Sequence, residues 1–341
     1  MTSRAVRWRF AFADLVIAIV AAVLVSRLSA PAVRHAAVAA AAVAPVATVT
    51  QQARPHAALG VLRAQTRFVP SRLVARNAPP VDARAAILVD MDSGRILFAQ
   101  NAYQQLPPAS TIKLLTAIVA LHNFDPDRLV TATADALQQD WDESKMGLRP
   151  GDTLSVQELL TGMLTISAND AANVLAMDTV GMRQFVAAMN AQASALGLHD
   201  THATSPVGLD DPAMRSSAYD IAVMAAVAVE RFPLLRDIVD TQYTVLPASS
   251  LHPAFFLDNI NLLLRMYAPA VGIKTGYTGD AGACEVGMAV RDGHRLISVI
   301  LNGNLVYSSS RRLLDWGFTQ YGLPSLLPAP TPSPSPAAAP H

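Results

Sequence analysis

The sequence predicts one α+β domain, in which strands near both ends of the folded region enclose a run of helices. Two segments with the pattern of β-hairpins lie far apart, at 85–99 and 283–301, and the residues between them show apolar positions at helical spacing. This order differs from that of repeated βαβ units. It favours one sheet built from both ends of the domain, together with a cluster of helices.

Each element follows from a local pattern. The first hairpin places strands at 85–89 and 95–99 around the polar turn Asp90-Met91-Asp92-Ser93-Gly94. The second pairs 283–291 with 295–301 and reverses at Asp292-Gly293, a strong two-residue turn signal. A further strand is expected over 270–275. Apolar periodicity predicts helices that begin near residue 110 and that cover 156–164, 170–180, 182–196, 219–229 and 309–321.

Composition excludes several classes of function. The chain has 341 residues, 15% of them charged, and its 26 basic and 26 acidic side chains give a formal net charge of zero. This balance supports neither nucleic-acid binding nor a polybasic membrane patch. Cys284 is the only cysteine, so a small buried residue is expected there, with no disulfide within the chain. His199 and His202 are three residues apart, but the proline and glycine that follow disfavour a metal site, and no metal or cofactor is expected.

The two ends of the chain differ in composition from the middle. Three arginines among the first nine residues precede an apolar stretch, uninterrupted over 15–25, which is short for a membrane span and fits the core of a signal peptide. Residues 1–30 are therefore predicted to be a signal peptide or an uncleaved membrane anchor that exports the chain. The alternative is a buried N-terminal helix. Residues 31–82 have the composition of an Ala/Pro-rich linker, 83–321 form the domain, and 322–341 are a Pro/Ser/Ala-rich tail, disordered by composition.

The segment around Ser110 carries the first chemical signal. Pro107 and Pro108 can precede a helix but cannot lie inside one, so Ser110 and Lys113 fall in the first turn, on one face. Ser110 could simply cap the helix, with Lys113 as a surface side chain. However, a capping box has Glu or Gln where Lys113 stands, and a cation opposes the helix dipole there. A lysine whose pKa is depressed in this way can take the proton of a serine nucleophile.

Two further motifs are ambiguous when taken alone. Ser167-Ala168-Asn169 lies between two predicted helices, and Ser167 with Asp170 resembles a capping box. Alternatively, the motif supplies a hydroxyl to relay a proton and an amide to hold a substrate carbonyl. Lys274-Thr275-Gly276 ends a predicted strand, where Lys274 could be a solvent-facing edge lysine. Alternatively, Gly276 allows the backbone to approach a ligand, while Lys274 and Thr275 meet its carboxylate.

In the order S-x-x-K, S-x-N and K-T-G, the three motifs resemble the active-site set of penicillin-recognising serine enzymes. Within that group the chain is most similar to the low-molecular-mass D-alanyl-D-alanine carboxypeptidases, over about residues 84–320. The matching text lies at 86–94, 108–113, 147–152, 167–172, 259–263, 272–278 and 315–318. The resemblance implies a five-stranded antiparallel sheet with a helical cluster, and an active site between the two.

The resemblance also implies roles for the motif residues. Ser110 would attack the carbonyl carbon of the terminal D-Ala-D-Ala peptide bond, with Lys113 as base. The backbone N–H groups of Ser110 and Tyr277 would form the oxyanion hole, and Ser167 would pass a proton to the departing D-alanine. The expected partners are peptidoglycan pentapeptides and β-lactams, outside the cytoplasmic membrane, with membrane attachment through the N-terminal segment.

On the substrate side, the resemblance places Asn169, Lys274, Thr275, Gly276 and Tyr277 in the binding site. One departure concerns the substrate carboxylate. Many relatives have an arginine about a dozen residues before the Trp-Gly-Phe sequence, near where this chain has Val306. Carboxylate binding would then be weaker, or it would use one of the two arginines at 311–312.

Three other activities compete with a carboxypeptidase. A D,D-endopeptidase acting on peptidoglycan cross-links would use the same residues. A class A β-lactamase needs a glutamate with an asparagine four residues later, after the S-x-N motif. Glu230 and Glu285 are followed at that distance by Leu234 and Ala289, which counts against this reading. A non-catalytic penicillin-binding protein of the cell wall would not need every motif side chain, yet all are present.

Overall fold

A computed structural model describes residues 59–64, 66–70, 77–140 and 143–328. The predicted signal peptide or anchor at 1–30, most of the linker and residues 329–341 of the tail lie outside the described residues. The described residues belong to one unit of the chain, Pro55–His341. Within them, no helix is both long enough and apolar enough to cross a membrane.

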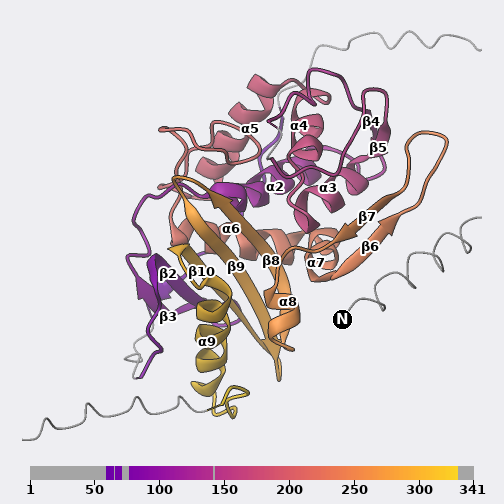
Figure 1. Cartoon of the computed structure of the whole chain (residues 1–341). Coiled ribbons are helices and arrows are strands. Elements are labelled where there is room, and N and C mark those ends of the chain that lie inside the picture. The colour runs from indigo at the N-terminus through magenta and orange to yellow at the C-terminus, as the bar shows by residue number, and fades with distance from the viewer. Residues whose placement is uncertain (1–58, 65, 71–76, 141–142, 329–341) are drawn as a thin grey trace, which may run out of the picture. The chain divides into compact units, whose positions relative to one another are not determined.

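The main sheet joins the two ends of the domain, as the two hairpins predict. In spatial order its strands are β1 (Val69–Pro70), β3 (Arg95–Gln100), β2 (Ala83–Asp90), β10 (His294–Gly303), β9 (Gly282–Arg291) and β8 (Ala270–Thr278). β2 pairs with β10 antiparallel, with Ile87 opposite Val299, so the first hairpin lies directly beside the second (Figure 1). β8, which carries the Lys274 motif, is the edge strand at the far side of the sheet.

The expectation of five antiparallel strands is incomplete, because a sixth strand makes the sheet mixed. β1 pairs parallel to β3, with Val69 opposite Arg95 and Pro70 opposite Ile96. The other five strands pair antiparallel, as expected. A two-residue strand that contains a proline carries no periodic signal, which is why its sequence reads as linker.

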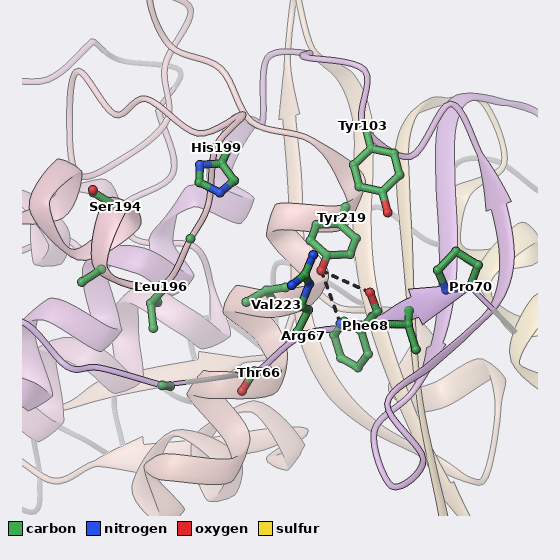
Figure 2. A pocket seen from close by; sticks show the side chains of 14 residues that line it. Thr66, Arg67, Phe68, Pro70, Tyr103, Ser194, Leu196, His199, Tyr219 and Val223 are labelled. Atoms are coloured by element: carbon green, nitrogen blue, oxygen red, sulfur yellow. Dashed lines mark hydrogen bonds between the residues drawn. The ribbon is translucent and has the colours of Figure 1, made fainter.

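The folded region also begins before residue 83. The Gln192 side chain accepts a hydrogen bond from Leu62 N and donates one to Leu62 O, both at 2.7 Å. Phe68 is buried, its N–H donates to the Tyr219 hydroxyl, and this hydroxyl donates to the Phe68 carbonyl (Figure 2). A cavity of about 730 Å³ lies between this segment and the helices that hold it. Residues 59–70 therefore include a segment that is bound to the surface of the domain by these hydrogen bonds, called the strap below, rather than free linker.

The helices lie between β3 and β8 in the sequence, apart from the last one. They are α2 (Lys113–Asn123), α3 (Val156–Thr165), α4 (Asn169–Met177), α5 (Met182–Ala195), α6 (Ala218–Arg231), α7 (Pro233–Asp240), α8 (Leu263–Met266) and α9 (Val306–Thr319). Two small ribbons accompany them: β4 (Leu129–Thr131) with β5 (Thr153–Ser155), and β6 (Tyr243–Leu246) with β7 (Phe255–Asp258). The sequence predicted α2 to α6 and α9, while α7, α8 and both ribbons are additions.

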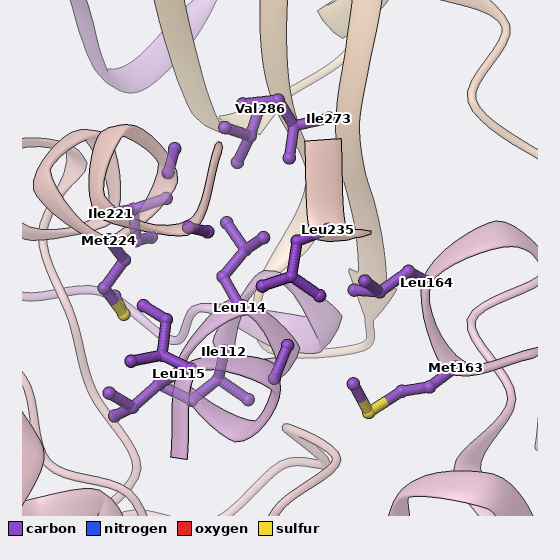
Figure 3. Close-up of a cluster of buried hydrophobic side chains, with 14 of the residues drawn as sticks. Ile112, Leu114, Leu115, Met163, Leu164, Ile221, Met224, Leu235, Ile273 and Val286 are labelled. Atoms are coloured by element: carbon purple, nitrogen blue, oxygen red, sulfur yellow. The ribbon is translucent and has the colours of Figure 1, made fainter. Parts of the chain in front are cut away.

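Both faces of the sheet are buried at its central strands β2, β9 and β10, so most of their length lacks a polar side. Ile87 and Val89 of β2 contribute to the core shared with the helical cluster, whereas Leu88 contributes to a second core under α9. α6 is buried along nearly its whole length, as expected for a helix that is apolar all round. Figure 3 shows how side chains from α2, α3, α6 and α7 meet the strand residues Ile273 and Val286. This packing fixes the start of α2 against β8.

Candidate active site

Ser110 and Lys113 lie where a 3₁₀ turn, η1 (Ala109–Ile112), continues into α2. Lys113 Nζ lies 3.0 Å from Ser110 Oγ. The interpretation of Ser110 as a helix cap and of Lys113 as a surface side chain is wrong in both parts. Ser110 caps neither helix, because η1 and α2 have no side-chain cap, and Lys113 is 0% exposed. The hydroxyl and the amine thus meet inside the protein.

Two glycines hold the Ser110 turn by close approach of backbone to backbone. Gly208 has φ of +88°, and a β-carbon there would lie 2.1 Å from the carbonyl oxygen of Ala109. A β-carbon on Gly276 would lie 2.8 Å from Ser110 N. The edge of β8 therefore runs directly along the turn that presents Ser110.

The Ser167 motif meets the same lysine from the gap between α3 and α4. Lys113 Nζ lies 2.9 Å from the Ser167 carbonyl oxygen and 3.3 Å from Ser167 Oγ, and it also donates to Asn169 Oδ1. Ser167 has φ of +63°, and it does not cap α4, whose N-cap is Ala168 without a side-chain bond. The capping-box interpretation of Ser167 and Asp170 is therefore wrong.

The electrostatic surroundings of Lys113 favour its neutral form. Burial lowers the pKa of Lys113 well below its ordinary value, and the positive charge of Lys274 lowers it further. The carboxylates of Glu143 and Asp170 act in the opposite direction. The net effect favours the uncharged amine, which is the form that can accept a proton.

Asp170 has a different role from the one its spacing predicts. Its carboxylate accepts hydrogen bonds from three successive backbone N–H groups at 146–148, at 2.8–3.1 Å, and so ties the preceding loop to α4. In that loop, Glu143 Oε2 accepts from Asn169 Nδ2 at 2.6 Å. The sequence analysis missed Glu143, because an irregular loop has no period that would place its side chains.

Lys274 is buried at 1% exposure, so the interpretation as a solvent-facing edge lysine is wrong. Burial lowers its pKa to about 7, and Nζ donates to the Thr275 carbonyl at 2.9 Å. No hydrogen bond among the described residues joins Lys274 to Ser110 or Lys113. The two lysines are nevertheless close enough for the charge of Lys274 to act on the pKa of Lys113.

A cleft of about 740 Å³ collects most of the predicted residues. Its lining includes Ser110, Ser167, Asn169, Thr275, Gly276 and Tyr277. Tyr277 is 74% exposed at its mouth. Residues that the sequence analysis did not assign to the site also line the cleft, and they include Asp140, Glu143, Asp210, Cys284 and Tyr307.

The cleft lining contains no arginine among its described residues. Val306 lines it, at the place where many relatives are expected to have one. Arg311 instead turns toward α8, where its Nη1 donates to the Met266 carbonyl, and Arg312 does not line the cleft. Lys113 and Lys274 are not among the lining residues either, because both are buried behind the surface of the cleft.

A serine hydroxyl against a buried amine, with a second serine and an edge strand beside them, is the arrangement of a serine hydrolase. The sequence profile of the D-alanyl-D-alanine carboxypeptidase family matches residues 73–304. The chain belongs to this family of serine-type, penicillin-binding hydrolases, which act on peptidoglycan peptides outside the cytoplasm.

Individual relatives agree with this assignment. D-alanyl-D-alanine carboxypeptidase DacB2 of Mycobacterium tuberculosis is 36% identical over 248 residues, covering 70% of this chain and 84% of the relative. DacF of Bacillus subtilis is 30% identical, and the match covers 70% of this chain but only 63% of that relative.

Solved structures agree on the fold. The crystal structure of a D-alanyl-D-alanine carboxypeptidase from Mycobacterium tuberculosis has a TM-score of 0.66 at 36% identity, covering 71% of this chain and 93% of that one. A Streptomyces DD-transpeptidase has a TM-score of 0.66 at 27% identity, covering 71% and 99%. These matches confirm the α+β fold predicted from the sequence.

Proposed function

We propose that this carboxypeptidase acts through an acyl-enzyme on Ser110, with Lys113 as the general base. One observation carries the proposal: the Ser110 hydroxyl lies 3.0 Å from the amine of a lysine that is fully buried. Burial lowers the pKa of Lys113 and so favours the uncharged amine, which at this distance can remove the hydroxyl proton. Ser167 Oγ also faces this amine, so the geometry allows a proton to pass between Lys113 and Ser167.

In the first step, Ser110 Oγ attacks the carbonyl carbon of the penultimate D-alanine while Lys113 takes its proton. The bond to the terminal D-alanine then breaks, and Ser167 passes a proton to the departing amine nitrogen. Water hydrolyses the ester and restores the serine. The 3.3 Å separation between Lys113 Nζ and Ser167 Oγ supports a direct return of the proton along this route.

The negative charge that develops on the carbonyl oxygen requires donors. We assign these to the backbone N–H groups of Ser110 and Tyr277. The close approach of Gly276 to Ser110 N supports the assignment, because it brings the edge of β8 to the serine. The loss of one such donor typically costs about 10²–10³ in rate.

The remaining motif residues hold the substrate. Asn169 Nδ2 carries two hydrogens and donates to Glu143, so a second hydrogen is left for a substrate carbonyl. Lys274 and Thr275 bind the terminal carboxylate. Burial of Lys274 strengthens this attraction, because a cation in low dielectric attracts a carboxylate more strongly than one in water.

The pH profile tests the two lysines together. Lys113 must be neutral and Lys274 must be charged, so kcat/KM should rise through the lowered pKa of Lys113 and fall above about pH 7, where Lys274 loses its proton. Because the two charges interact, both limbs are properties of the pair. Lys274→Arg keeps the positive charge at every pH and should move the alkaline limb upward. An alkaline limb that stays in place in this variant would exclude Lys274 as its source.

Two assays test the reaction itself. Fluorescent penicillin should label the protein, and mass spectrometry of the digested adduct should locate the label on the peptide that contains Ser110. Incubation with a pentapeptide should release free D-alanine. Opened cross-linked dimers without D-alanine release from pentapeptide would instead indicate a D,D-endopeptidase, and rapid penicillin turnover without an adduct would indicate a β-lactamase.

We also propose that residues 1–30 export the chain and keep it at the membrane as an uncleaved anchor. This proposal rests on the arginines and the apolar stretch of the sequence, which lie outside the described residues. The intact mass of protein recovered from membranes should include this segment. A mature protein that begins after residue 30 and is found in the soluble extracytoplasmic fraction would contradict anchoring.

A further inference from the structure

Glu143 is joined to the proposed base through a chain of hydrogen bonds. It lies in the loop between β4 and β5 and is half-buried. Its Oε2 accepts from Asn169 Nδ2 at 2.6 Å, and its Oε1 accepts from Asp140 N at 3.1 Å. Asn169 Oδ1 in turn accepts from Lys113 Nζ, which lies 3.0 Å from Ser110 Oγ.

The direction of this chain depends on the charge of the carboxylate. The asparagine side chain has a donor end and an acceptor end of nearly the same shape, so either end could face the lysine. An ionised carboxylate can only accept hydrogen bonds, and therefore it selects the NH₂ end of Asn169. The oxygen is then left to accept from Lys113 Nζ, whereas a flipped amide would donate to the lone pair of the uncharged amine, which is the lone pair that must take the Ser110 proton.

We propose that Glu143 is a positioning residue for acylation, which fixes the orientation of the Asn169 amide and thereby the place of Lys113 Nζ beside Ser110. This inference rests on the roles proposed above for Ser110 and Lys113. Glu143 touches neither of these side chains in the described contacts, so it acts through Asn169. Loss of the carboxylate frees the amide to turn, and small misplacements of reacting groups are costly in rate.

Glu143 also acts on Lys113 by its charge. The charged groups that act on Lys113 are Lys274 from β8, Asp170 from α4 and Glu143 from the loop. The carboxylate of Glu143 raises the pKa of Lys113, against the larger effect of burial. Without this charge, the amine should be neutral at lower pH. The orientation effect and the charge effect can therefore be separated by two substitutions.

The experiment measures the second-order rate of acylation by fluorescent penicillin from acid to neutral pH. Glu143→Gln keeps an acceptor for Asn169 but removes the charge, so its acid limb should move to lower pH while the plateau rate stays close to that of the wild type. Glu143→Ala removes both the acceptor and the charge. The acid limb of its acylation rate should therefore move to lower pH as in Glu143→Gln, and its plateau rate should fall about tenfold or more. In an Asn169→Ala background, Glu143→Ala should cause no further loss of plateau rate.

Asp140→Asn is the matched control. This exposed carboxylate lines the same cleft, but no described hydrogen bond joins its side chain to Asn169 or Lys113. It should leave the midpoint of the acid limb in place, whereas a shift equal to that of Glu143→Gln would indicate a general effect of acidic charge and overturn the inference. Thermal melting checks each fold, and if Glu143→Ala does not fold, Glu143→Asp, which keeps the charge but shortens the reach to Asn169 Nδ2, takes its place in the comparison of plateau rates.

Two results separate this inference from the proposed function. If the wild type is not labelled at Ser110, the proposed function itself fails. If the wild type is labelled but a folded Glu143→Ala keeps the wild-type plateau rate, only the positioning role of Glu143 is overturned, and a wild-type acid limb in Glu143→Gln overturns its charge effect on Lys113.

Discussion

Replacement of Ser110 with alanine should abolish both covalent labelling by penicillin and release of D-alanine. The Ser110 oxygen is the atom that would carry the acyl group, and alanine has no oxygen to replace it. A fall in kcat/KM of about 10⁴-fold or more is expected, since removal of a nucleophile leaves only binding and oxyanion stabilisation. Gel fluorescence and a D-alanine assay measure the two losses.

Ser167→Ala is the control for this variant, because it removes the other hydroxyl that faces Lys113. It should slow the release of D-alanine but still be labelled, with the adduct on Ser110. Folding should survive the Ser110→Ala change, because among the described residues Ser110 Oγ has a hydrogen bond only to Lys113. A labelled Ser110→Ala protein with its adduct on Ser167 would reverse the two assignments.

Local patterns account for much of the fold that the structure confirms. The two hairpins are confirmed as β2–β3 and β9–β10. They could be predicted because the turn and the two apolar runs of each hairpin are adjacent in the sequence. β1 and the strap at 59–70 could not be predicted in this way. Their anchors are single residues such as Leu62 and Phe68, separated by residues without a period, and their partners lie far along the chain.

The candidate site likewise has a part that local sequence patterns predict and a part that they do not. Ser110 and Lys113 are three residues apart in one helical turn, so the helical spacing alone predicts that their side chains lie close together. The convergence of Ser167 and Lys274 on that turn depends on long-range packing and came from the resemblance to a known family. Local spacing misled at Ser167, whose apparent partner Asp170 accepts from loop N–H groups instead. That loop delivers Glu143, which no local pattern could indicate.

Replacement of Lys113 with methionine should remove the base while nearly filling the same space. Acylation by penicillin should slow by about 10²–10⁴-fold, the usual contribution of a general base. Lys113→Arg gives the matched comparison, because it keeps a cation but has a side chain that does not lose its proton. If the arginine variant acylates at the wild-type rate, the lysine acts by its charge and not as a base.

The substitution Lys113→Met should also change how the free energy of unfolding depends on pH. In the folded state the pKa of Lys113 lies well below its ordinary value, so over the range between this pKa and the unfolded value near 10.4 the unfolded chain binds one more proton. The free energy of unfolding of the wild type therefore gains about 1.4 kcal/mol per pH unit from this one lysine as the pH rises through that range. Lys113→Met should lose this contribution, and urea unfolding at several values between about pH 8 and 9.5 should show a shallower rise. An unchanged slope would mean that Lys113 stays charged in the folded protein, and an amine that holds its proton could not deprotonate Ser110.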